Sequence, residues 1–182
     1  ELARIETIAD KDELSAYFAR REIIGAGGPF LLSLWVDAKE SARYVSDMWP
    51  SGLGLPDRDY YFKEDDRSVE LRGAYVVHIE KMFELAGFDD PAGSAERMMA
   101  LETQLAEHHW TNVENRDDEK TYNKYSTDKL DTLADGVNWP AFLAEVGLQD
   151  ENDIIISQPS YIEGYNRIFA STSLEDWKTY MR

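Results

Sequence analysis

Apolar residues recur every three or four positions along most of the chain, which is the spacing of one face of an α-helix. The longest such stretch runs from Ser68 to Ala86 and is followed by Gly87. A glycine directly after a helical pattern is typical of a helix end. The spacing therefore predicts one long helix, with an apolar face formed by Leu71, Tyr75, Ile79, Met82, Phe83 and Ala86.

The same spacing predicts six further helices. They cover Asp12 to Ile24, Asp90-Pro91 to about Val113, Ser126 to Ala134, Asn138 to Gly147, Pro159 to Ala170, and a last one from Ser173 onward. Pro91 suits the first turn of a helix, where a missing N–H costs little. The inward faces we expect are Leu14, Tyr17, Phe18 and Ile24; Met98, Leu101, Leu105 and His109; Trp139, Phe142, Leu143 and Val146; Tyr161, Ile162, Tyr165, Ile168 and Phe169; and Trp177, Tyr180 and Met181.

Two short apolar runs have the character of strands. Phe30 to Val36 and Ala42 to Trp49 flank the polar stretch 37–41, which predicts a β-hairpin. The β-branched residues Ile154 to Ile156 predict one short extra strand. A lone hairpin is marginal in water, so we expect it to lie on helices. The fold class is therefore mainly α: a multi-helix domain with one β-hairpin and a short extra strand.

The composition limits the number of domains and the classes of binding partner. The chain has 182 residues, 43% of them hydrophobic, which suffices for one large domain or two small ones. Its 36 acidic residues against 19 basic ones give a net charge of −17, which repels phosphate backbones and excludes nucleic acid as a partner. Solubility is the simplest role of this charge, and attraction of basic peptides or cations is the alternative. Without cysteine there is no disulfide or thiolate metal site, and no apolar run of 18 residues predicts a membrane span.

The segment Gly52 to Tyr61 stands apart from these patterns. It holds too many Gly, Pro and Asp residues for a regular element, yet it carries two leucines and two tyrosines. A solvent loop has little use for four such side chains. The composition predicts a loop that packs its own apolar residues against the protein.

The histidines do not form a recognisable metal motif. A helical zinc site of the H-E-x-x-H type needs two histidines four positions apart. His108 and His109 are adjacent, so they would point about 100° apart on a helix, and His78 stands alone. We expect all three to be structural.

Other catalytic patterns are also missing. There is no cysteine and no G-x-S-x-G turn, and Gly52-Leu53-Gly54 lacks the third glycine of a dinucleotide site. The acidic pairs at 65–66, 89–90 and 117–118 could suggest acid–base chemistry or calcium, but each lies at a predicted helix end or in the charged break 114–120, which favours capping and solvation. The sequence thus predicts no catalytic and no metal-binding residue, and leaves substrate contacts unknown.

Four blocks resemble one family, the neprilysin-like zinc metallopeptidases. They are the loop Gly52 to Tyr61, the segment Lys120 to Lys124, the pair Asn138-Trp139 and the end Leu174 to Arg182. Their order and spacing also fit, so the resemblance covers nearly the whole chain. The structural signature residues are Gly52, Gly54, Pro56, Arg58, Asp59, Tyr60, Tyr61, Tyr122 and Asn123.

The resemblance implies an architecture. In that family two largely helical domains face each other across a cavity, and H-E-x-x-H, a glutamate ligand and N-A-x-Y lie C-terminal to the region resembled. None of these motifs occurs here, so no catalytic or zinc residue is carried over. Residues 1–182 then resemble the amino-terminal cap, with 1–62 as helix, hairpin and signature loop and 63–182 as helical cap. Zinc, the C-terminal catalytic domain and peptide substrates belong to the parent that the resemblance implies. That parent is expected to be exported (periplasmic, secreted or membrane-anchored), with a cytoplasmic location as the alternative.

The resemblance also assigns roles within the cap. Arg58, Tyr60 and Tyr61 are expected to lock the loop against the hairpin and helices, with direct substrate contact as the alternative. Because the pattern of the last helix is still running at Arg182, we expect an excised piece of a longer protein, inactive alone and with apolar surface exposed.

Two other functions remain open: a stand-alone acidic helical binding module, and a complete enzyme of unknown chemistry. A downstream H-E-x-x-H would separate the first of these from a peptidase cap.

Overall fold

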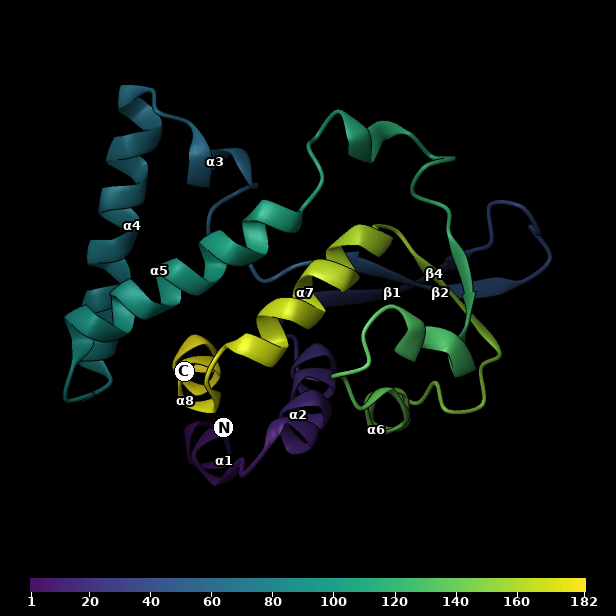
Figure 1. Cartoon of the computed structure of the whole chain (residues 1–182), viewed down its shortest axis with the longest axis horizontal. Coiled ribbons are helices and arrows are strands. Elements are labelled where there is room, and N and C mark those ends of the chain that lie inside the picture. The colour runs from purple at the N-terminus through teal and green to yellow at the C-terminus, as the bar shows by residue number, and fades with distance from the viewer.

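The computed structural model describes all residues 1–182 and confirms a mainly α fold (Figure 1). Eight α-helices, two 3₁₀ helices and a four-stranded sheet make up the chain. The helices are α1 Leu2–Thr7, α2 Lys11–Ile23, α3 Asp59–Phe62, α4 Asp66–Leu85, α5 Pro91–His108, η1 Glu114–Arg116, η2 Thr127–Thr132, α6 Trp139–Glu145, α7 Pro159–Ser171 and α8 Leu174–Met181; the strands are β1 Phe30–Val36, β2 Tyr44–Pro50, β3 Lys124–Ser126 and β4 Asp153–Ile156.

The sheet has the order β1-β2-β4-β3. β1 and β2 form the predicted antiparallel hairpin, with Phe30 opposite Pro50 and Val36 opposite Tyr44. β4, the predicted extra strand, runs parallel to β2 and antiparallel to β3. β3 was not predicted. Its three residues are too few to show an alternating pattern, and the strand forms because it pairs with β4.

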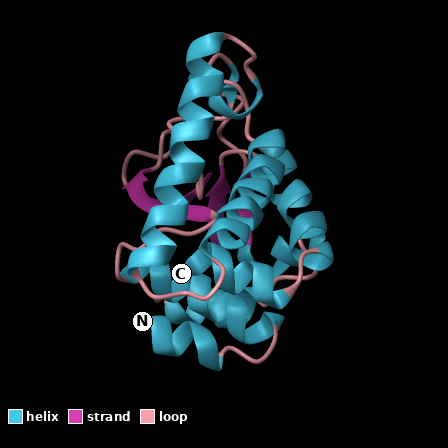
Figure 2. Ribbon diagram, turned by 90° about the vertical axis from the view of Figure 1, so that its left-hand side faces the viewer, coloured by secondary structure: helices cyan, strands magenta, loops and turns pink.

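The hairpin lies on helices, as expected. Figure 2 shows the strands near the middle of the molecule, with helices in front of them, to the right and below. Phe30 at the start of β1 joins a core of 27 buried residues, where its ring lies 4.6 Å from that of Tyr165 on α7 and 6.0 Å from that of Phe142 on α6. The residues of this core range from Ile5 to Met181. Both expected sub-parts, 1–62 and 63–182, therefore contribute to the same core.

Several helix limits differ from the predictions. α5 ends at His108 rather than near Val113, because His109 is extended (ψ 138°) and the Trp110 N–H donates to the Gln158 side chain at 2.8 Å. Residues 127–132 form a 3₁₀ helix in place of the predicted 126–134 α-helix. The short helices α1 and α3 were not predicted; at six and four residues they are shorter than the repeat that reveals a helix.

The apolar face of α4 is only half covered. Ile79 and Phe83 are buried against α5, but Leu71, Met82 and Ala86 are exposed, contrary to the continuous inward face predicted. α4 stands at one end of the molecule, beside α5 (Figure 1). One side of its stripe therefore has no partner within residues 1–182.

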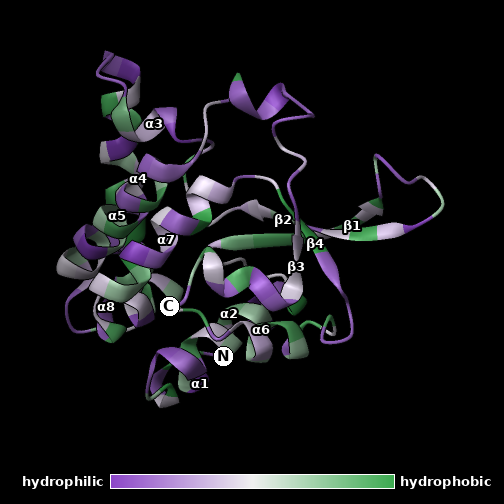
Figure 3. Cartoon of the chain, turned by 45° about the vertical axis from the view of Figure 1, so that its right-hand side comes forward, coloured by the Kyte–Doolittle hydropathy of each residue, from purple (hydrophilic) through white to green (hydrophobic).

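The last helix shows the opposite behaviour. Trp177, Tyr180 and Met181 of α8 are buried, and the Trp177 ring lies 5.4 Å from that of Phe18 on α2. Exposed apolar side chains are present on α4 and on the hairpin, where Leu34 and Trp35 are 63% and 62% exposed. Figure 3 shows hydrophobic segments along the ribbon of α4 and of β1. The chain thus exposes apolar surface, as expected, but α8 contributes none of it, because α8 completes the core.

Candidate functional site: the signature loop and its anchors

The signature loop, residues 52–61, is held where its glycines pass close to tyrosines. Gly52 has φ +88°, and a Cβ there would overlap the Tyr180 hydroxyl, which donates to the Gly52 carbonyl at 2.9 Å. A Cβ at Gly54 would overlap the Tyr75 hydroxyl of α4. Only glycine fits these two close approaches. The loop is thereby pinned to α8 at one point and to α4 at the other.

A buried carboxylate lies beneath the loop. Glu102 of α5 is 1% exposed and accepts hydrogen bonds from Tyr61 (2.6 Å), from Tyr75 (2.9 Å) and from the Gly54 N–H (3.3 Å). Burial raises the pKa of Glu102, although the three donors oppose the shift. Burial and the nearby carboxylate raise the pKa of Tyr61 and of Tyr75, so both keep their protons. Glu102 therefore ties the loop, α4 and α5 together.

The charged residues of the loop are engaged locally. The Arg58 guanidinium donates to the Ala106 carbonyl of α5 at 3.4 Å and lies over the Phe62 ring at 5.3 Å. Asp59 pairs with Lys63 at 3.0 Å. Asp57 accepts from the Asp59 N–H and from Asn112, at 2.8 and 2.9 Å.

The remaining loop residues differ in burial. Tyr60 is half-buried, and its carbonyl accepts from Arg72 of α4 at 3.0 Å, whereas Pro56 is exposed. Leu55 and Tyr61 are buried with Ala106 in a small cluster of their own. The prediction that this loop packs its own apolar residues is confirmed. The bonds of Tyr61 and Arg58 run to α5.

The second signature pair, Tyr122 and Asn123, secures the sheet. Tyr122 donates to the Asp37 carboxylate at 2.7 Å, and Lys124 donates to its other oxygen at 2.8 Å. Asp37 has no exposed surface, and the bonds from Lys124 and Tyr122 hold its pKa well below its usual range. Asn123 donates to the Ile156 carbonyl of β4 at 3.1 Å. This block thus joins the hairpin turn to β3 and β4.

The three histidines have different surroundings. His78 is exposed on α4. A Cβ at Gly164 of α7 would overlap the ring of His108, so these two elements touch there. His109 is half-buried, its ring lies 4.7 Å from that of Tyr161, and burial lowers its pKa to about 4.

The acidic pairs cap and turn the backbone, as predicted. Asp65 accepts from the Ser68 N–H at the start of α4, and Asp90 accepts from the Gly93 N–H at the start of α5, both at 3.1 Å. Asp117 accepts from the Lys120 N–H in a turn, also at 3.1 Å. No three His, Cys, Asp or Glu side chains in the structure are grouped so that they could hold a metal ion. The residues present therefore do not fit a zinc ion, and no step of zinc chemistry can be assigned to them.

Two polar hollows flank the loop, and Arg58, His109 and Trp110 line both. One, of about 270 Å³, lies against the loop itself, and the other, of about 350 Å³, reaches Glu163 and Arg167 of α7. The Thr111 hydroxyl, which lines the second hollow, donates to the Glu114 carboxylate in the same wall at 2.9 Å. The polar lining of the two hollows can position and cover a ligand.

The structure thus gathers seven signature residues in the loop and its short helix α3, and places Tyr122 and Asn123 at the sheet. Sequence reasoning missed Glu102 and Asp37, the two carboxylates that anchor these groups. Glu102 did leave a signal, because it is a charged residue inside the apolar spacing of Met98, Leu101 and Leu105. Asp37 left none, because aspartate is ordinary in a hairpin turn.

Comparison with known proteins identifies the family. The model of peptidase family M13 matches residues 1–182, and the chain belongs to that family, as part of its N-terminal region. It is 32% identical over 151 residues to endothelin-converting enzyme 1 of Cavia porcellus, a match that covers 79% of this chain and 20% of that protein.

Comparison with solved structures supports the same family assignment. The zinc metalloprotease Zmp1 of Mycobacterium tuberculosis, in complex with an inhibitor, matches with a TM-score of 0.92 and 34% identity, covering 98% of this chain and 28% of Zmp1. PepO from Lactobacillus rhamnosis HN001 shares the fold, with a TM-score of 0.73 at 13% identity over 99% of this chain and 28% of that one. The chain spans about a fifth to somewhat over a quarter of the length of these relatives.

None of the helices combines the length and the apolar character needed to cross a membrane.

Proposed function

We propose that residues 1–182 form a non-catalytic segment that caps the cavity of a zinc-dependent metalloendopeptidase, whose C-terminal catalytic domain lies elsewhere in the same protein. The observation that carries this proposal is the match to Zmp1, a zinc metalloprotease, at 34% identity over 98% of the chain. Residues 1–62 supply the hairpin and signature loop, and 63–182 supply the helical cap. The signature residues act structurally: those of the loop fix it on α4, α5 and α8, and Tyr122 and Asn123 secure the sheet.

In this proposal the cap has a steric role and takes no part in bond cleavage. Its rigid loop and helices limit entry to peptides and keep bulk water from the cavity. The zinc ion sits in the catalytic domain, where it supplies an activated water for peptide-bond hydrolysis. Arg58 and the hollows beside it are the part of the cap best placed to touch a peptide. We also propose that the parent is exported, as the family resemblance implies.

The test uses the full-length natural protein and the chain 1–182 side by side. Zinc content is measured by atomic emission, and cleavage is followed with a quenched fluorescent peptide library. We expect zinc and cleavage in the full-length protein and neither in the chain alone. A full-length protein that binds no zinc and cleaves no peptide would refute the proposal and favour a stand-alone binding module.

A further inference from the structure

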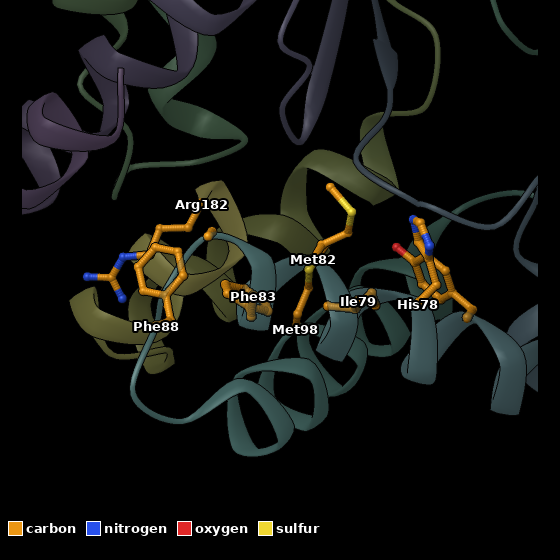
Figure 4. Close-up of a pocket in the computed structure, with 9 residues that line it drawn as sticks. His78, Ile79, Met82, Phe83, Phe88, Met98 and Arg182 are labelled. Carbon is orange, nitrogen blue, oxygen red and sulfur yellow. The ribbon is translucent and has the colours of Figure 1, made fainter.

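An apolar groove runs along the uncovered side of α4. It has a volume of about 280 Å³ and lies between α4, the start of α5 and the end of α8 (Figure 4). Seven of its nine lining residues are hydrophobic. From α4 it takes Tyr75, His78, Ile79, Met82 and Phe83, to which are added Ala86 at the C-terminal cap of α4, Phe88, Met98 and Arg182.

The α4 residues of the groove form one helical stripe. Their spacing of three and four positions is that of a single face, and the twelve residues from Tyr75 to Ala86 span about 16 Å of helix. Met82, near the middle, is 53% exposed although it lies between buried Ile79 and Phe83. A stripe of this spacing and length matches an amphipathic helix of about three turns lying in the groove.

One end of the groove is formed by the last residue of the chain. The Arg182 guanidinium lies over the Phe88 ring at 5.4 Å, opposite the end marked by His78 (Figure 4). Arg182 is bound through two nitrogens to Glu6 at 2.9 Å each and to Glu175 at 2.7 Å. Its backbone N–H donates to the Lys178 carbonyl at 3.1 Å, so helical hydrogen bonding reaches this residue. The exit point of α8 is therefore fixed at the rim of the groove.

We infer that the groove is the docking site of the segment that directly follows Arg182 in the full-length protein. This segment, of about a dozen residues, lies as a helix antiparallel to α4, with apolar side chains spaced three or four apart against Met82 and Ile79. The inference rests on the proposed function, under which the catalytic part follows this chain. Matched relatives extend well beyond the region shared with it, since the chain covers only 28% of Zmp1.

Photo-crosslinking in the full-length protein tests this. The benzophenone amino acid p-benzoylphenylalanine replaces Met82, and in a matched control it replaces Val77. Val77 is 65% exposed on the same helix but lies outside the groove, about 140° around the helix from Met82. After irradiation, mass spectrometry of the digest identifies the linked peptide.

We expect the probe at position 82 to link to the dozen or so residues after Arg182, and the probe at position 77 not to do so. A link from position 82 to any other segment, to a second copy of the protein or to added peptide substrate would overturn the inference. Absence of any link from position 82, with the probe incorporated, would overturn it as well.

Hydrogen exchange gives an independent readout. Met82→Asp should raise the exchange rate of the docked segment at least about tenfold, whereas Val77→Asp should leave it unchanged. Equal exchange in both variants contradicts the inference. Zinc content and peptide cleavage of the same preparations report on the proposed function separately, so an active protein that links elsewhere refutes the docking alone.

Discussion

At the scale of single residues, Glu102 joins the signature loop to α4 and α5. One carboxylate satisfies two tyrosine hydroxyls and one backbone N–H, from the loop and from α4. A buried polar group that loses its partner costs more than the hydrogen bond itself contributed. The signature loop therefore depends on a residue outside the signature.

We predict that Glu102→Ala lowers the free energy of unfolding of chain 1–182 by about 3 kcal/mol, because it leaves the Tyr61 and Tyr75 hydroxyls buried without a partner. Glu102→Gln keeps an acceptor oxygen, and we expect a loss of about 1 kcal/mol. Urea unfolding measures both values. Equal losses in the two variants would show that the hydroxyls find other partners.

His109 predicts a dependence of stability on pH. Its pKa is lowered to about 4 in the folded chain, against about 6.5 when unfolded. Between these values the unfolded state binds more protons, so His109 makes stability fall as pH drops from 6.5 to 4, by up to about 3 kcal/mol. His109→Gln should flatten this part of the profile.

Urea unfolding at pH 4.5 and pH 7 checks the His109 prediction. His78→Gln, at an exposed position, is the control and should keep the wild-type profile. If both variants behave alike, the pH dependence arises elsewhere.

At the scale of elements, α4 depends on the loop that precedes it. A Cβ at Gly54 would displace the Tyr75 hydroxyl from Glu102, whereas a Cβ at Gly73, within α4, would meet no atom within 4 Å. Gly54 is therefore required by a close contact, whereas Gly73 can be replaced, so substitution of Gly73 is a suitable control for substitution of Gly54.

We predict that Gly54→Ala destabilises the chain by about 2 kcal/mol, because the tyrosine must move, while Gly73→Ala stabilises it by about 0.5–1 kcal/mol as alanine replaces glycine in a helix interior. Thermal unfolding of the two variants checks the opposite signs. A stable Gly54→Ala variant would show that Tyr75 has room to shift.

The elements also show what sequence can predict. The hairpin and the long helices follow from spacing, because α4 and α7 repeat their pattern over 20 and 13 residues. Spacing does not predict the end of α5, the strand β3 or the 3₁₀ helix η2, because contacts with residues distant in the sequence determine these features. Gln158 takes the Trp110 N–H, and β4 supplies the partner of β3. The signature loop was recognisable from composition, but its anchor Glu102 lies 41 positions from Tyr61.

At the scale of the whole molecule, the chain has an open sheet edge. In the antiparallel register, alternate residues of β1 turn their backbone groups outward. The Leu32 N–H at this edge is covered by the Glu22 carboxylate at 3.1 Å. Toward the outer end of β1, Leu34 and Val36 are exposed, and β1 has no other strand beside it. Open apolar edges promote strand pairing between molecules.

We predict that chain 1–182 self-associates through β1 when salt screens its net charge of −17. Leu34→Lys should shift the chain to monomer, because an edge lysine opposes pairing. Leu85→Lys, at a 71% exposed site on α4, is the control and should not. Sedimentation velocity distinguishes them. A wild-type chain that is monomeric at high concentration would refute the prediction.

The pairing of Arg182 with Glu6 has a further consequence. It brings the first and last helices into contact, and Lys178 adds a bond to the Glu6 carbonyl at 3.1 Å, so the two ends of the chain lie side by side (Figure 1). Chain ends this close allow circular permutation. A short linker from Arg182 to Glu1, with new termini opened in the polar turn at 117–120, should give a chain that folds to the same core in a different order of synthesis.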